Sequence, residues 1–437
     1  MDLLRNIFKG DKVVWIIFLC LCLISVVEVF SASSTLIYDS GNHWAPITRH
    51  ASFLAGGALV VIFFHNVPYR WFQLLPRLLL PLAGIFLILL LVFDNLHLGG
   101  LLVIEKTNEA GRWVKLLGIP FQPSEFAKMG VIIATAYYLS RGQNEKGASP
   151  KAFWQILRVA GITCLLILPE NYSTAALLFM VVYMMMIVGR IQARKLLALG
   201  ALLLAAALLF VGFLFVTPDS SLEKIPLGHR FTTVKGRIAD FVSSEEVPPS
   251  KYNISDNAQV GHARIAVATS GILGKGPGNS VQRDFLSQAY SDFIFAIIIE
   301  ELGLLGGGFV VFLYLWLLIR CWRIANKCER TFPAFLVLGI GLILVTQAMF
   351  NMMVAVGLAP VTGQPLPLIS RGGTSTIINC VYIGLILSVS RYNIEQQQLR
   401  EAEEAAAAAQ AEQVETQDVQ APAEPSAPSL NNDDELV

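Results

Sequence analysis

The strongest candidate for chemistry in this sequence is Asp292, an acid at the start of a long apolar run. Glu300 and Glu301 follow about two helical turns further on. Carboxylates at membrane depth are costly, so each is a hypothesis for a functional site. Asp292 could instead stabilise the start of a helix through the helix dipole. Glu300 and Glu301 point about 100° apart on a helix, so at least one must face protein, and we expect pairing with a base inside the membrane.

A second candidate lies in GRWVKLLGIPFQPSEFAKMG, residues 111–130. Its Pro-Ser dipeptide is typical of a helix start, and Glu125 and Lys128 follow with a spacing that lets them pair on one helix face. The pair could be purely structural. With Arg112 and Lys115 nearby, it could also receive an anionic head group such as a diphosphate, to which the Arg guanidinium is geometrically suited. The residues alone leave both roles open.

A third candidate is GLAPVTGQPLPLISRGGTSTI, residues 357–377, which holds three prolines and several polar residues, among them Ser370 and Arg371. Irregular backbone between membrane helices is tolerated only where it is buried in protein or lines a cavity. We therefore expect this segment to form the wall of a cavity.

Other signals are weaker. The glycines of SGILGKGPGNS, residues 270–280, lack the preceding strand and the lysine and hydroxyl of a phosphate-binding loop, so a nucleotide site is not expected. Six histidines and six cysteines are scattered without metal-ligand spacing or a disulfide pattern. No metal site is predicted.

These candidates must be positioned by membrane helices, because 54% of the 437 residues are hydrophobic and only 15% are charged, against about 25% charged residues in soluble domains. The first apolar run is too long for a signal peptide and has no cleavage site, so we interpret it as a retained span. The predicted fold is all-α, a polytopic membrane protein of ten transmembrane helices. The spans lie near 13–32, 48–65, 74–93, 124–140, 153–169, 172–189, 196–216, 292–319, 333–356 and 373–390.

Basic residues set the predicted orientation, because Lys and Arg accumulate in short cytoplasmic loops. With both termini in the cytoplasm, every inner loop is basic, and residues 217–291 form a large extracytoplasmic loop. The inner bases are Arg5, Lys9, Lys12, Arg70, Arg141, Lys146, Lys151, Arg190, Arg194, Lys195, Arg320, Arg323, Lys327, Arg330 and Arg391.

The chain is predicted to divide into a membrane domain, residues 1–392, and an acidic, mostly disordered cytoplasmic tail, residues 393–437. From Gln396 onward there are ten acids and one base, while the rest has 31 bases and 22 acids, a net charge of +9. The tail lacks apolar residues to bury. The formal neutrality of the whole chain therefore indicates nothing about partners.

The sequence resembles the SEDS family, the FtsW/RodA/SpoVE group, over residues 10–392. The resemblance is carried by RWVKLLGIPFQPSEFAK, by SGILGKGPGNS followed by SDFIFAIIIEELGLLG, and by APVTGQPLPLISRGGTS. It implies a peptidoglycan glycosyltransferase that polymerises lipid II, with inversion at the sugar, at the outer face of the bacterial cytoplasmic membrane. GPGNSVQ and the acidic tail favour the FtsW type, and thus septal synthesis during cell division.

The resemblance also implies roles for individual residues. Asp292 would be the essential acid and act as general base towards the acceptor hydroxyl. Substrate binding, including cationic help for the departing diphosphate, would fall to a set of mostly charged residues, aided by a possible divalent cation such as Mg or Mn. The set is Arg49, Arg112, Glu125, Lys128 and Ser370.

The chain departs from the family pattern at three places. Gln288-Ala289-Tyr290-Ser291 replaces the usual acidic-Ala-His-Thr lead into Asp292, Arg371 replaces an aromatic residue, and Asn171 replaces a commonly acidic one. We interpret these changes as divergence of lineage rather than loss of activity.

Expected partners are lipid II, a class B penicillin-binding transpeptidase and other membrane proteins of the division complex, and no nucleic acid. Two other classes of function stay open, a lipid II flippase and a non-catalytic division scaffold. A flippase needs polar groups through the whole membrane depth, whereas the strongest features here gather on the outer side.

Overall fold

The computed structural model describes residues 9–33, 44–93, 95–98, 102–105, 114–116, 119–144, 147–222, 228–243, 258–286 and 289–420. The chain divides into two compact units, Met1–Arg391 and Tyr392–Val437. Within the second unit the described residues, as far as Gln420, are helical. The predicted sites lie in the first unit.

Helices lie at all ten predicted positions. Their bounds are α2 Lys12–Ser31, α4 Ala45–Asn66, α5 Leu75–Val92, α6 Pro123–Ser140, α7 Pro150–Ile167, α8 Tyr172–Val188, α9 Ala193–Val216, α13 Ile294–Asn326, α14 Thr331–Ala355 and α15 Gly373–Gln420. In the described part of the chain, eight helices are long and apolar enough to cross a membrane, and α6 and α8 are not among them. α8 is apolar but has 17 residues. The count of ten crossings stays a prediction.

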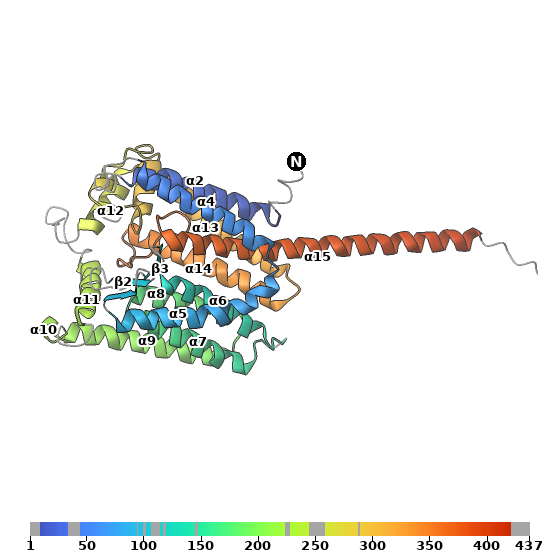
Figure 1. Cartoon of the computed structure of the whole chain (residues 1–437), viewed down its shortest axis with the longest axis horizontal. Coiled ribbons are helices and arrows are strands. Elements are labelled where there is room, and N and C mark those ends of the chain that lie inside the picture. Colours follow the sequence, from blue (N-terminus) through green and yellow to red (C-terminus); the bar gives the residue numbers. More distant parts are fainter. Residues whose placement is uncertain are drawn as a thin grey trace, which may run out of the picture. The chain divides into compact units, whose positions relative to one another are not determined.

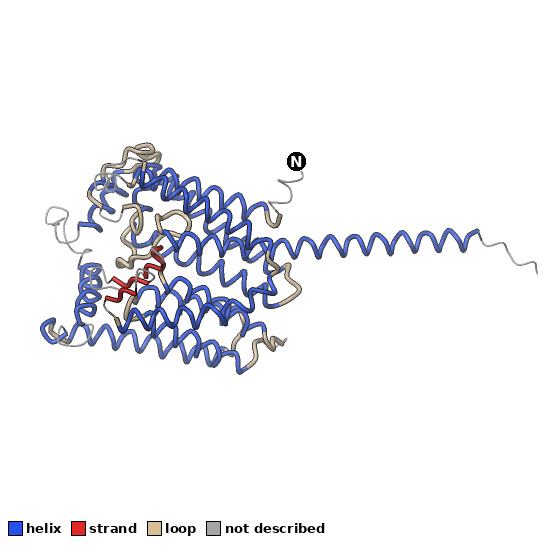
Figure 2. Tube along the Cα trace, in the orientation of Figure 1, coloured by secondary structure: helices blue, strands red, loops and turns tan. Residues whose placement is uncertain are grey.

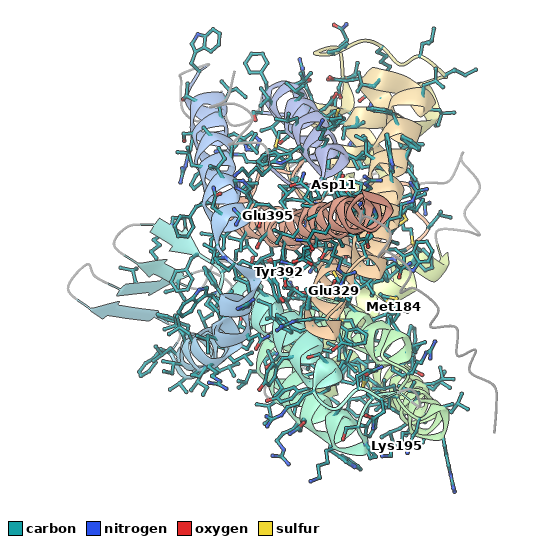
Figure 3. All side chains as sticks on the ribbon, turned by 90° about the vertical axis from the view of Figure 1, so that its right-hand side faces the viewer. Asp11, Met184, Lys195, Glu329, Tyr392 and Glu395 are labelled. Atoms are coloured by element: carbon teal, nitrogen blue, oxygen red, sulfur yellow. The ribbon has the colours of Figure 1, made fainter. Side chains whose placement is uncertain are left out.

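The helices of the first unit run side by side (Figure 1). The shorter helices α10 Asp219–Leu222, α11 Gly228–Ser243 and α12 Ala258–Thr269 gather at one end of this bundle. Figure 3 looks along the bundle from the opposite end, where Asp11, Lys195 and Glu329 lie. Segments predicted to share a side of the membrane therefore lie at the same end. Which end faces the cytoplasm stays a prediction.

A small antiparallel sheet interrupts the expected all-α pattern between α5 and α6. Its strands are β1 Asn95–Leu98, β2 Leu102–Glu105, β3 Val114–Leu116 and β4 Ile119–Phe121, in the order β1-β2-β3-β4. Strands of three or four residues are too short to give a clear alternating pattern, which is why the sequence did not reveal them. Figure 2 shows them at the same end of the bundle as α11.

The helix α13 is broken at Gly303, which has a φ of 71°. The glycine loop, residues 270–286, fills the break: Leu304 N donates to Gly271 O and Gly276 N donates to Glu301 O, at 3.2 and 2.8 Å. A Cβ at Gly303 would lie 2.2 Å from Ile272 O. Glycine is required here by both the positive φ and the close backbone approach.

The middle of the unit is formed by α14, which packs against α13, α6 and α8. Of the 18 most apolar consecutive residues in each helix, 72% are buried in α14 and 11% in α9. Polar side chains on α14 therefore face protein, and the functional candidates converge on this helix.

Candidate functional site

Asp292 lies just before α13, whose N-cap residue is Phe293. It is half-buried, and its Oδ1 accepts a hydrogen bond of 3.0 Å from Ser291 Oγ. Its main-chain oxygen accepts a hydrogen bond of 2.9 Å from Asn351 Nδ2 on α14. The backbone of Asp292 is therefore held by α14, and its half-buried carboxyl lies at the start of α13.

Ser370 joins the α14–α15 segment, residues 356–372, to this acid. Ser370 Oγ donates to Ser291 O at 2.6 Å and accepts from Leu366 N at 2.7 Å. One residue further, Arg371 N donates to Tyr290 O at 2.9 Å. The structure therefore brings Ser370 and Arg371 next to the residues that lead into Asp292.

Glu125 and Lys128 form a buried ion pair on α6. Lys128 Nζ lies 2.7 Å from Glu125 Oε1, with the side chains 1% and 5% exposed. Lys128 Nζ also donates to Gln347 Oε1 at 3.1 Å, and Gln347 Nε2 donates to Pro365 O at 3.0 Å. The pair thus reaches the α14–α15 segment through Gln347.

Gln347 and Asn351 were missed by the sequence reasoning, although two amides four residues apart in an apolar helix are a detectable signal. Asn351 Nδ2 donates to Gln364 O at 2.8 Å as well as to Asp292 O. Gln347 binds the next carbonyl, that of Pro365. The two amides therefore hold the α14–α15 segment at two consecutive residues.

Asn171 is the N-cap of α8. Its Oδ1 accepts from Thr174 N at 3.0 Å, a role that Asn fills well. Thr174 Oγ1 in turn accepts from Gln364 Nε2 at 2.7 Å. Asn171 therefore supports the same segment from the α8 side.

The Arg371 guanidinium lies beside the entry to α13, and the charge of Arg49 acts on it. Arg49, on α4, is exposed, whereas Arg371 is half-buried with its guanidinium carbon 5.4 Å from the centre of the Tyr290 ring. Burial lowers the pKa of Arg371 from its usual range; Tyr290 opposes this shift and the positive charge of Arg49 adds to it. Arg112, the third predicted base, lies outside the described residues.

Glu300 and Glu301 hold the glycine loop. Glu300 Oε1 lies 2.6 Å from Lys275 Nζ, and Glu301 accepts from the backbone of Gly278 and Ser280 at 2.8 and 3.1 Å. The base paired with Glu300 comes from the loop folded into the break of α13. Both acids are therefore occupied by structural contacts.

The described residues contain no group of three or more His, Cys, Asp or Glu side chains that could hold a metal ion. A single carboxylate such as that of Asp292 is a weak site for a divalent cation. No chemistry is assigned to a metal.

Three comparisons place the chain among known proteins. The family model FTSW_RODA_SPOVE, described as a cell cycle protein, matches residues 11–395. The Halomonas elongata protein named "Probable peptidoglycan glycosyltransferase FtsW" is 31% identical and covers 88% of this chain and 90% of its own length. The Hahella chejuensis protein of the same name is 32% identical, with the same coverage of both chains.

Two solved structures share the fold. A chain from a peptidoglycan synthase complex, studied for the coordination of polymerization and crosslinking, has a TM-score of 0.67 at 22% identity and covers 88% of this chain and 99% of its own. Thermus thermophilus rod shape determining protein RodA has a TM-score of 0.58 at 22% identity, covering 88% and 98%. At this identity the likeness concerns the fold.

Proposed function

Because this chain belongs to the FtsW/RodA/SpoVE family, we propose that it is a peptidoglycan glycosyltransferase that polymerises lipid II at the outer face of the bacterial cytoplasmic membrane. The observation that carries the proposal is the half-buried Asp292, which is held by hydrogen bonds from Asn351 and Ser291 and lies two residues after Tyr290, whose ring contacts the Arg371 guanidinium. An acid fixed next to cations is what transfer of a sugar from a diphosphate carrier requires.

In the proposed reaction, the hydroxyl of an acceptor sugar attacks the anomeric carbon of a lipid-linked sugar. A new carbon–oxygen bond forms while the bond to the diphosphate breaks, and the diphosphate keeps the bonding electrons. Asp292 takes the proton of the hydroxyl and later releases it to water. One displacement inverts the anomeric centre. A base placed in this way typically contributes ~10² to 10⁴ in rate.

Charge on the departing diphosphate needs cationic stabilisation, because it grows as the bond breaks. Arg49 is exposed near the entry to α13 and supplies it in this proposal. The Lys128 side chain is 1% exposed and is paired with Glu125. Glu125 and Lys128 are instead proposed to hold the α14–α15 segment through Gln347, and Ser370 is proposed to position Ser291.

The membrane arrangement follows from the same proposal. Ten crossings with both termini in the cytoplasm place residues 217–291 and Asp292 on the outer side, where both lipid-anchored substrates reach the site without leaving the bilayer. The acidic tail, residues 393–437, is then cytoplasmic. The product would be uncrosslinked glycan, so the proposed partner is a class B penicillin-binding transpeptidase, acting at the division septum.

The function is tested by supplying the purified full-length protein with lipid II, alone and with a cognate transpeptidase, and resolving glycan polymers on a gel. Polymer that depends on this protein supports the proposal. A protein that instead moves lipid II between the leaflets of a vesicle and makes no polymer would be a transporter.

A further inference from the structure

Arg371 is a half-buried cation that lies over the ring of Tyr290. Among the described residues its guanidinium forms no ion pair with a carboxylate, and its nearest aromatic contact is the face of Tyr290. A guanidinium carries five N–H donors in one plane and stays charged at neutral pH. In a half-buried position, such donors are normally matched by carboxylate or phosphate oxygens.

Arg49 adds a second positive charge that acts on Arg371. The two guanidiniums act on each other electrostatically, and Arg49 has no ion pair among the residues that the structure describes. Like charges held close together destabilise a fold when no anion lies between them. An anionic ligand bound at Arg371 would therefore be attracted by both charges.

The position of this pair relative to Asp292 is fixed by short contacts. Arg371 N donates to Tyr290 O at 2.9 Å, and Tyr290 precedes Asp292 by two residues. Ser370 Oγ donates to Ser291 O at 2.6 Å. Arg371 is thus held next to the residues that lead into the acid that the proposed reaction uses.

We propose that Arg371 and Arg49 form a binding subsite for the diphosphate of a polyprenyl-linked sugar, with Arg371 as a substrate-binding residue. The inference rests on the proposed function, because that reaction releases a diphosphate. The guanidinium plane is suited to two parallel hydrogen bonds with phosphate oxygens. Tyr290 stacks on this plane and holds it in place.

The test measures binding of undecaprenyl diphosphate to the full-length protein in detergent, by native mass spectrometry. Arg371→Gln should raise the Kd about 10- to 100-fold, the range expected for losing a charge-assisted hydrogen bond. The same substitution should weaken the binding of undecaprenyl monophosphate much less, because this ligand has one phosphate fewer for Arg371 to bind. Arg371→Lys should recover part of the binding, and Arg323→Gln, at the far end of α13, should behave as wild type. Inorganic pyrophosphate should compete only weakly, since it lacks the lipid.

Each result decides the question. Unchanged diphosphate affinity in Arg371→Gln overturns the subsite, as does an equal loss for diphosphate and monophosphate, which indicates a general structural defect. If Arg371→Gln does not fold, Arg371→Lys and Arg49→Gln carry the comparison. A wild-type protein that binds diphosphate through Arg371 but makes no polymer retains the subsite and refutes the glycosyltransferase. If the protein polymerises lipid II normally but binds the diphosphate independently of Arg371, the glycosyltransferase is retained and the subsite is refuted.

Discussion

Replacing Lys128 by methionine should separate the two roles that the sequence allows for the ion pair of α6. The Lys128 ammonium is 1% exposed and lies 2.7 Å from Glu125 Oε1. Lys128→Met keeps a long apolar side chain but leaves the Glu125 carboxylate buried without its cation. Breaking a buried ion pair in this way costs ~3 to 5 kcal/mol.

The double variant Glu125→Gln/Lys128→Met is the matched control. It removes both charges, and replacing a buried pair as a whole is often neutral for stability. We therefore expect most of the stability lost in Lys128→Met to return. Since, among the described residues, the hydrogen bonds from the pair to the α14–α15 segment run through Gln347, polymerising activity should return with the stability.

The assay is unfolding in detergent by heat or denaturant for wild type, single and double variants, with polymerisation measured on the same samples. Full stability of Lys128→Met would refute the argument from burial. A stable but inactive double variant would show that the pair contacts substrate, and would restore the head-group role.

Two further predictions concern the fold. Gly303→Ala should lower stability by about 1–3 kcal/mol, because the residue has a positive φ and its Cβ would lie 2.2 Å from Ile272 O. Hydrogen exchange should show the glycine loop opening. The control Gly308→Ala, whose Cβ would have nothing within 4 Å, should be neutral or slightly stabilising. In a cysteine-free background, Ser220→Cys should be labelled from outside intact cells and Gln398→Cys only after permeabilisation; labelling of both from one side would contradict the ten-span topology.

The helices could be predicted because each apolar run carries its own signal, independent of what it packs against. The pairing of Glu125 with Lys128 could also be predicted from a local signal, since the two residues lie one turn apart on one helix. The predicted pairing of Glu300 with a base was also found, but the base, Lys275, comes from a loop rather than a membrane helix.

Contacts between distant segments could not be predicted from the sequence. Nothing local to Asn351 indicates that it binds the carbonyls of Asp292 and Gln364, because that choice depends on how α14 meets two irregular segments. The break of α13 is similar: glycine tolerates a helix as well as a positive φ, so Gly303 alone does not reveal that a loop enters there. These long-range contacts are what assemble the site around Asp292.

The central claim, that Asp292 is the general base, is tested most directly by one comparison of lipid II polymerisation. Asp292→Asn keeps the size of the side chain and removes the proton acceptor, so the account predicts a folded membrane protein that binds its transpeptidase and yields no detectable polymer. Asp284→Asn, whose side chain is 54% exposed, should retain most activity. Near-normal polymer from Asp292→Asn would contradict the account, and an inactive Asp284→Asn beside it would move the catalytic role to the glycine loop.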